Sequence, residues 1–104
     1  MENDIVIAIN KHQTVRSSEI LMLKADINYT HILLENGNSI LSSRTLGIFE
    51  RRLFNQPFFR PNRAIIINLD YMIEFEKSAS KIKMSNNEII PLSRRRTKQF
   101  LTRI

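Results

Sequence analysis

Three consecutive arginines near the carboxyl end, Arg94, Arg95 and Arg96, suit the binding of an anion, and they directly follow Ser93. Serine commonly caps the start of a helix, where free N–H groups disfavour each cation by a few tenths of a kcal/mol, up to about 1 kcal/mol. A phosphate group would offset this cost, because it accepts hydrogen bonds from backbone N–H groups and guanidinium forks together. Arginine also pairs bidentately with guanine in the major groove. The alternative is a solvated helix face that serves solubility, which is the usual role of a charge run.

The charge of the whole chain points the same way. Sixteen Lys and Arg against ten Asp and Glu give a net charge of +6 at pH 7, which favours a polyanionic partner such as nucleic acid or a membrane surface. The plain alternative is a basic soluble domain. The positive residues are clustered, however: nine of the sixteen lie between Arg51 and Arg63 or in the last eleven positions, whereas the acidic residues are scattered.

Several kinds of chemistry find no support in the sequence. The absence of cysteine excludes disulfides, thiolate catalysis and thiolate metal sites. His12 and His31 lie far apart and outside any metal-ligand spacing, carboxylates form no acid–base pair, and no Gly-rich phosphate loop is present. We therefore expect no enzymatic activity, no metal and no cofactor. With neither a long apolar run nor a signal peptide, we expect a soluble, cytoplasmic protein outside the membrane.

The basic residues must be positioned by a mainly β architecture. A length of 104 residues with 42% apolar content predicts a single domain spanning residues 1–104. Alternation over residues 5–9, followed by "TVR", predicts a first pair of strands, and "EILMLKA" predicts a buried strand. "THILLENGNSILSS" predicts a hairpin, because its Asn36-Gly37 dipeptide suits the positive φ angles of a type I′ turn. Residues 71–76, "KIKM" and "EIIPL" predict further strands around Asn86-Asn87.

Two segments predict helices. In "TLGIFERRLF", Leu46, Phe49 and Leu53 fall on one helical face, and Pro57 is expected to end the helix. "FFRPNRAIIIN" follows, in which we expect residues 65–67 to form an apolar plug. In the terminal segment a narrow arc holds the residues expected to face the core, namely Thr97, Phe100, Leu101 and Ile104. Arg95 lies almost opposite this arc and is predicted to face away from the core.

These segments, taken together, resemble the LytTR DNA-binding domain family, the output module of many bacterial response regulators. "EILMLKADINYTHILLENG" is similar to the family's "I-x-Y-I-E-A-x-x-N-Y-T" strand and loop. "TLGIFERRLFNQPFFRPNRAIIINLDYMIEF" is similar to its "T-L-x-x-L-E-x-x-L…F-x-R-x-H-R-S-x-I-V-N-x-x-x-I", and "PLSRRRTKQFL" to its closing "V-S-R-R" helix. No single piece is very specific, but three in the right order and spacing are. The resemblance extends from about Asp4 to Ile104.

The resemblance implies an elongated fold of antiparallel β-sheets with one internal helix and a short C-terminal helix, whose loops enter successive major grooves. It places DNA contacts on Asp26, Ile27, Asn28 and Tyr29, on Asn62 and Arg63, and on Arg94 and Arg95, with Arg96 beside them. Asn62 and Ala64 depart from the usual His and Ser; the asparagine either pairs with adenine and alters sequence preference or reduces binding. The alternative for Tyr29 is that it closes the core at the end of a strand.

The expected function is therefore sequence-specific binding of double-stranded DNA in transcription. Arg63 and Arg95 are expected to contact bases, and Arg94, Arg96 and Asn28 to contact phosphate or flanking groups. Family members often bind direct repeats, so two copies per site and a weak homodimer on DNA are expected. The alternative is a basic module that binds a protein partner or an anionic membrane without specific DNA binding. A role in RNA binding is disfavoured, because no interleaved aromatic platform is present.

Regulation is not encoded in a recognisable way. Response regulators carry a receiver domain with a phosphorylated Asp, and 104 residues leave no room for one. The chain is thus either an excised domain or a stand-alone regulator, and the start at Met1 favours the second.

Overall fold

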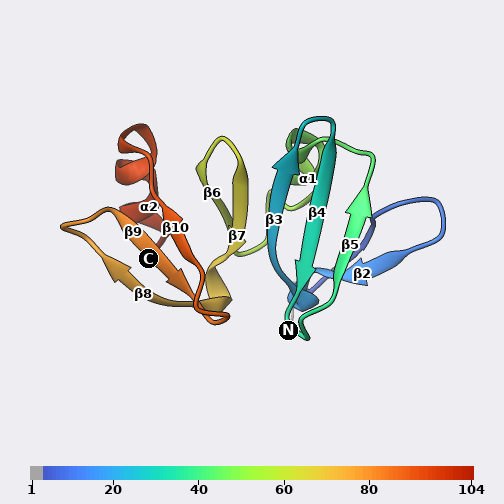
Figure 1. The fold of residues 1–104 in the computed structure, drawn as a ribbon, viewed down its shortest axis with the longest axis horizontal. Helices are drawn as coiled ribbons and strands as arrows, with labels where there is room; N and C mark the ends of the chain where they lie inside the picture. Colours follow the sequence, from blue (N-terminus) through green and yellow to red (C-terminus); the bar gives the residue numbers. More distant parts are fainter. Residues whose placement is uncertain (1–3) are drawn as a thin grey trace.

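Strands dominate residues 4–104, the part of the chain that the computed structural model describes; the first three positions of the predicted domain 1–104 lie outside it. Ten strands form three antiparallel sheets (Figure 1). A five-stranded central sheet has the order β5-β4-β3-β7-β6, a three-stranded sheet has the order β10-β9-β8, and β1 pairs with β2. The strands are β1 Val6–Ala8, β2 Thr14–Arg16, β3 Ile20–Asp26, β4 Tyr29–Leu34, β5 Ser39–Ser42, β6 Phe58–Asn62, β7 Ile65–Asn68, β8 Met72–Glu76, β9 Lys81–Met84 and β10 Ile89–Pro91.

The helical elements are short and lie at the borders of these sheets. They comprise the α-helices α1 Leu46–Arg52 and α2 Thr97–Arg103, and the 3₁₀ turns η1 Ser17–Glu19, η2 Leu69–Tyr71 and η3 Arg94–Arg96. The molecule measures 42 × 32 × 24 Å along its principal axes. The predicted class, mainly β and elongated with one internal and one terminal helix, is therefore confirmed.

The central sheet separates two apolar clusters, because successive residues of a strand point to opposite faces. On β7, Ile66 belongs to one cluster and Ile67 to the other, and both are buried. On β6, Phe58 and Phe59 divide in the same way. Strand β7, "IIIN", is thus buried on both faces, and it pairs with β6 in a hairpin, where residues 65–67 were predicted only as an apolar plug.

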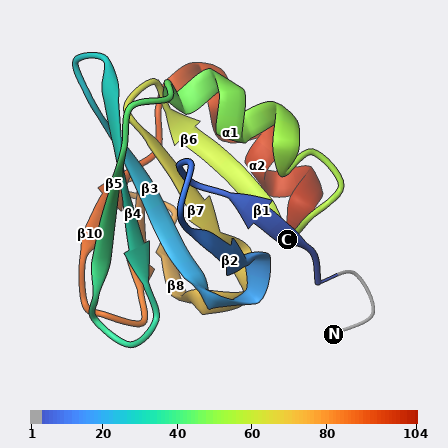
Figure 2. The ribbon, with the colours of Figure 1, turned by 90° about the vertical axis from the view of Figure 1, so that its right-hand side faces the viewer.

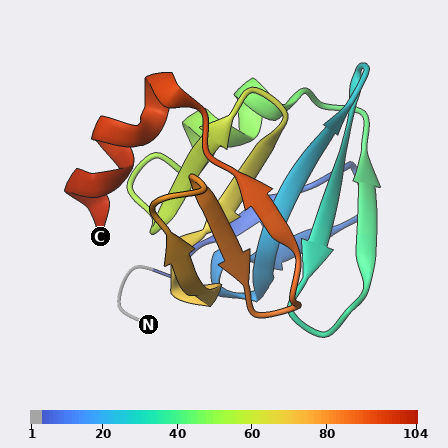
Figure 3. The ribbon, with the colours of Figure 1, turned by 60° about the vertical axis from the view of Figure 1, so that its left-hand side comes forward.

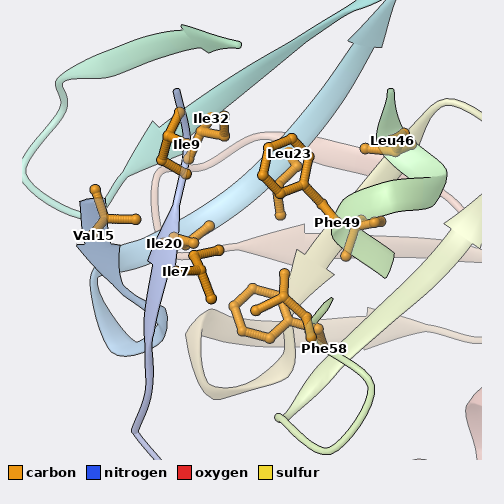
Figure 4. Packing of buried hydrophobic residues seen from close by; sticks show 11 residues of the cluster. Ile7, Ile9, Val15, Ile20, Leu23, Ile32, Leu46, Phe49 and Phe58 are labelled. Atoms are coloured by element: carbon orange, nitrogen blue, oxygen red, sulfur yellow. The ribbon is translucent and has the colours of Figure 1, made fainter. Parts of the chain in front are cut away.

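The first cluster fills the space between the central sheet, the β1–β2 ribbon and α1. Figure 4 shows Ile7, Ile9 and Val15 from the ribbon directed toward Ile20 and neighbouring side chains of the sheet. From α1, Leu46 and Phe49 enter the same cluster, and Leu53 follows directly after the helix. The predicted first strand pair and the predicted apolar face of the internal helix are both confirmed.

The second cluster lies between the central sheet, the β8–β9–β10 sheet and α2, which Figure 3 shows at the edge of that smaller sheet. Phe100 of α2 is fully buried there. Its ring centroid lies 5.4 Å from that of Phe59 and 4.8 Å from that of Phe75 in an edge-on arrangement. The prediction of a core-facing arc was too broad, since Leu101 and Ile104 are 42% and 55% exposed. A helix of seven residues at the edge of a small sheet directs one large side chain into the cluster.

Two predicted local details were wrong. The β4–β5 hairpin exists, but among its loop residues only Gly37 has positive φ, at 93°, whereas a type I′ turn requires two such residues. Gly37 N–H donates to the Leu34 carbonyl at 3.0 Å, and Leu34 N–H donates to the Asn38 carbonyl at 2.8 Å. This is a three-residue loop that places its glycine in the left-handed region. Helix α1 ends at Arg52, ahead of Pro57, so the proline does not terminate it.

Two polar groups fix the segments that surround the central sheet. The Asp4 carboxylate accepts hydrogen bonds from the Ser18 N–H and from the hydroxyls of Ser17 and Ser18, each at 2.9 Å, and the Ser18 backbone bond is the main cause that lowers its pKa to about 2. The Tyr71 hydroxyl lies 2.6 Å from the Ser18 carbonyl and 2.8 Å from Glu35 Oε2. Burial and the nearby Glu35 carboxylate raise the pKa of Tyr71 to about 12.

Candidate nucleic-acid interface

The three segments predicted to contact DNA lie on one edge of the molecule. They are the β3–β4 turn at Ile27-Asn28, the β6–β7 turn at Arg63-Ala64, and η3 with its arginines. Figure 1, in which the longest axis is horizontal, shows η3, the β6–β7 turn and the β3–β4 turn following one another along the upper edge. We call this surface the loop edge. The structure thus brings together segments separated by more than sixty positions in the sequence.

Backbone pairing joins the first two segments. Strands β3 and β7 are neighbours, and Lys24 is paired with Ile65 at the end of their register. One step further, the Ala25 N–H donates to the Ala64 carbonyl at 2.8 Å. The end of β3 and the β6–β7 turn therefore keep a fixed relation, which positions the Asp26–Tyr29 hairpin tip relative to Arg63.

Asn62 joins the second segment to the third. Its side-chain Nδ2 donates to the Pro91 carbonyl at 2.8 Å, and its Oδ1 accepts the Ala64 N–H at 2.9 Å. Nearby, the Ser93 N–H donates to the Pro61 carbonyl at 2.9 Å. Both ends of the Asn62 amide are thus engaged within the protein. Each end of the amide keeps one further hydrogen-bonding site, but the two bonds fix its orientation, so pairing with adenine is restricted to that orientation.

Arg60 is a further residue of this region, and sequence reasoning did not assign it a role. Its Nη2 donates to the Arg63 carbonyl at 2.6 Å and its Nη1 contacts Glu50 Oε1 at 2.8 Å, while the side chain is only 19% exposed. The Arg60 carbonyl in turn accepts from Arg96 Nη1 at 3.2 Å. Arg60 therefore supports both the β6–β7 turn and η3. The sequence identified Arg60 only as one of the positive residues between Arg51 and Arg63, because its hydrogen-bond partners are set by the tertiary fold.

The predicted contact residues differ in their exposure. Arg63, Arg94 and Arg95 are exposed, whereas Asn62 and Arg96 are half-buried. The exposure of Arg95 agrees with its predicted position opposite the buried face of the terminal segment. Tyr29 is 49% exposed, so the alternative in which it closes the core is wrong. At the tip of the β3–β4 hairpin, Asp26, Ile27, Asn28 and Tyr29 are all exposed, as is the preceding Ala25.

The arginine run does not occupy the first turn of an α-helix. It forms the 3₁₀ turn η3, Ser93 makes no side-chain cap, and α2 starts only at Thr97. The Arg96 N–H already donates to the Ser93 carbonyl at 3.0 Å, and the Thr97 N–H donates to the Arg94 carbonyl. The prediction that these arginines lie at the free N–H groups and dipole of an α-helix is therefore wrong. What remains is the placement of two exposed guanidinium groups at the end of the loop edge.

The acidic residue of the hairpin tip is engaged by a neighbour. His31 Nε2 lies 3.0 Å from Asp26 Oδ2, and both residues belong to the β3–β4 hairpin. The pair holds the carboxylate toward the body of the hairpin and away from the tip. As expected, His31 is a strand residue and His12 belongs to the β1–β2 connection. Within residues 4–104 no group of three or more His, Cys, Asp or Glu side chains could hold a metal ion.

Comparison with known proteins agrees with this geometry. The sequence model of the LytTr DNA-binding domain matches residues 10–104. The chain belongs to the LytTR family. Domains of this family bind DNA and are not enzymes, so double-stranded DNA is the partner that membership implies. No curated protein matches the chain, and none of the helices within residues 4–104 is long and apolar enough to cross a membrane.

A solved structure shares the fold. It is the LytTr DNA-binding domain of a presumed methyl-accepting/DNA response regulator from Bacillus cereus. The two chains superpose with a TM-score of 0.73 at 20% sequence identity, over 96% of this chain and 94% of the other. The LytTR arrangement of sheets and helices is therefore retained although four residues in five differ. The resemblance noted in the sequence is confirmed.

Proposed function

We propose that this LytTR domain is a sequence-specific, double-stranded DNA-binding regulator whose loop edge contacts successive major grooves. One observation carries the proposal: the three loops are hydrogen-bonded into a single row along the long axis, with Arg63, Arg94 and Arg95 exposed on it. The row follows the long axis of a molecule that measures 42 Å, so its loops succeed one another along one side of a duplex with a helical turn of about 34–36 Å. Different loops of the row then face neighbouring grooves on that side.

The exposed residues divide into two roles. We assign base contacts to Arg63 and Arg95, because each is exposed and arginine pairs bidentately with guanine. Arg94 and Asn28 contact phosphate or flanking groups. Arg96 contributes positive charge while it holds the Arg60 carbonyl, which limits its freedom to enter a groove. Asn62 positions the loops through its two hydrogen bonds and lies beside Arg63 at the DNA.

The wider setting is part of the same proposal. The chain acts as one domain in the cytoplasm, as a regulator of the response-regulator output type in bacterial two-component signalling. Two copies bind direct repeats and form a weak homodimer only on DNA. Repeats spaced by whole helical turns would place both copies on the same side of the duplex.

Selection from a randomised duplex library tests the proposal. The purified protein is incubated with the library at moderate salt, and bound molecules are amplified through several rounds and sequenced. Enrichment of a short motif, especially in two copies separated by a whole number of helical turns, supports the specific regulator. Retention without enrichment indicates a basic surface that coats DNA. Absence of retention would favour the alternative module that binds a protein partner or an anionic membrane.

Two variants then test the division of roles. Arg95→Ala should cost about 1–3 kcal/mol on the selected site and relax preference at one base pair. Arg96→Ala should weaken binding to selected and random duplexes about equally, since it removes charge and a contact to Arg60. Affinities are measured on both duplexes by fluorescence anisotropy. Equal losses on the two duplexes for both variants would show that the assigned roles are wrong.

A further inference from the structure

Ile27 is the most exposed large apolar residue described in the chain, at 92%. It occupies the tip of the β3–β4 hairpin, where Asp26 pairs with Tyr29 and leaves Ile27 and Asn28 as a two-residue turn. Figures 2 and 3, from two directions, show this tip projecting beyond the neighbouring strands. The side chain therefore faces solvent and does not pack in the core.

The backbone at this residue is unfavourable for isoleucine. Its φ angle is +56°, in the left-handed region where the branched Cβ crowds the backbone. Glycine or asparagine would satisfy such a turn at lower cost, and asparagine occupies the adjacent position. Neither packing nor turn geometry explains an isoleucine here. Strain of this kind at an exposed tip is typical of a functional position.

The surroundings of the tip limit its partner. The Ala25–Ala64 backbone bond places the tip on the same edge as Arg63, with Arg94 and Arg95 further along. A partner that meets the tip also meets these cations, as double-stranded DNA would. The apolar group that DNA presents in the major groove is the C5-methyl of thymine, which aliphatic side chains contact.

We propose that Ile27 contacts the C5-methyl group of a thymine and thereby sets preference at one base pair. This inference rests on the proposed function, because it requires the hairpin tip to enter the major groove. It assigns base specificity to an apolar residue of the loop edge, in addition to the arginines. The isoleucine at this strained turn position then contributes to recognition of the DNA sequence.

Replacement of thymine by deoxyuridine in the selected site tests this contact, because it removes the methyl group alone. Each thymine is replaced in turn, and binding is measured for the wild type, Ile27→Ala and Ile73→Ala. Ile73 on β8 is a matched control, since it is an exposed isoleucine away from the loop edge. One replacement should weaken wild-type and Ile73→Ala binding about fourfold, the factor for one methyl group removed from water. The same replacement should leave Ile27→Ala binding unchanged.

Ile27→Gly provides an independent measurement, because glycine relieves the strain at positive φ. This variant should unfold at a higher urea concentration than the wild type and still lose the response to deoxyuridine. If no replacement weakens the wild type, or if Ile27→Ala responds equally, the thymine contact is refuted while the proposed function stands. Loss of the response in Ile73→Ala would refute it too. Failure to select any site would refute both.

Discussion

Asn62 shows how a single side chain can join two parts of a binding surface. Replacing it with alanine removes the bonds to the Pro91 carbonyl and the Ala64 N–H, each worth about 0.5–1.5 kcal/mol. We expect Asn62→Ala to lower the free energy of unfolding by about 1–3 kcal/mol. It should also reduce preference for the selected DNA site over random DNA, because the β6–β7 turn and the segment that leads to η3 lose one of the contacts between them. Urea unfolding and anisotropy titrations measure the two effects.

Asn36 supplies the control for this variant. Its Oδ1 accepts the Asn38 N–H at 2.9 Å, a local turn bond like the one from Ala64 to Asn62, but it lies in the β4–β5 loop. Asn36→Ala should cost less stability and leave DNA binding unchanged. If Asn62→Ala instead retained wild-type stability and lost preference for adenine at one position, Asn62 would be a base-contacting residue.

Asp4 predicts a specific pH dependence of stability. Its pKa of about 2 in the folded protein is below the ordinary value near 3.8, so the folded state binds fewer protons than the unfolded state between these values. The stabilising contribution is complete above about pH 4 and is lost as the pH falls toward 2. We expect the difference in unfolding free energy between wild type and Asp4→Asn to shrink over this interval. Denaturant titrations from pH 2 to pH 6 provide the measurement, and a constant difference would contradict the assignment.

At the residue scale, the sequence predicted which side chains face solvent better than it predicted their hydrogen-bond partners. Arg95 was placed away from the core by helical periodicity, and its exposure agrees. The roles of Asn62 and Arg60 were not predictable, because Asn62 bonds to a carbonyl 29 positions away and Arg60 supports a turn formed by tertiary pairing. The spacing of side chains along a strand carries no information about such contacts.

At the scale of elements, two hairpins use the same three-residue loop with different residues in the left-handed position. Gly37 has φ of 93° in the β4–β5 loop, and Asn87 has φ of 72° in the β9–β10 loop. In both loops the hydrogen bonds follow one pattern, since Asn87 N–H donates to the Met84 carbonyl as Gly37 N–H donates to that of Leu34. A side chain at this position therefore lowers stability through backbone strain at positive φ.

The effect of a substitution in these loops on stability should depend on the sign of φ at the substituted residue. We expect Gly37→Ala and Asn87→Ala each to lower the free energy of unfolding by about 1 kcal/mol, because no atom lies within 4 Å of a Cβ at Gly37 and only the backbone is strained. Asn87→Gly should be neutral or slightly stabilising. Urea unfolding at fixed pH measures all three variants.

Gly47 in α1 is the matched control, because a Cβ added there would meet equally open space but the backbone has no positive φ. Gly47→Ala should stabilise the protein by about 0.5–1 kcal/mol, since alanine favours helix. A gain in Gly37→Ala similar to that in Gly47→Ala would show that the left-handed backbone at Gly37 imposes no penalty.

Elements with clear periodicity were the ones that the sequence predicted. Strands β1 to β5 and β8 to β10 follow alternation or short apolar runs, and α1 follows its apolar face. The β6–β7 hairpin was missed because Arg60 and Pro61 interrupt the pattern of β6, where the register shifts between Phe59 and Asn62. The end of α1 was attributed to Pro57, but the helix ends at Arg52. The next residue, Leu53, leaves the helical conformation and packs in the core.

At the scale of the whole molecule, the central sheet serves two purposes. Its two faces carry separate apolar clusters, which hold the β1–β2 ribbon and α1 on one side and the β8–β9–β10 sheet and α2 on the other. Its upper edge carries two of the three loops, and α2 anchors η3 beside them through Phe100. Packing on both faces of the central sheet therefore holds the loops of the candidate site in place. Periodicity along the chain could not predict this row, because its members meet only through sheet order and cross-sheet packing; the resemblance to the family alone implied it.

The row also predicts how affinity depends on salt. Each phosphate neutralised by an arginine releases condensed counterions, so the logarithm of the binding constant falls linearly with the logarithm of salt concentration, with a slope of about −0.9 per contact. Arg94→Ala should reduce the steepness of this slope by about one on both selected and random duplexes, because Arg94 is exposed at one end of the row. Lys11→Ala removes an equal charge from the β1–β2 connection, at the opposite end of the molecule from η3 in Figure 1, and should leave the slope unchanged. Anisotropy titrations at salt concentrations from about 50 to about 300 mM, where affinity changes steeply, distinguish the two variants. Equal changes in both variants would mean that net charge, and not the loop edge, governs binding.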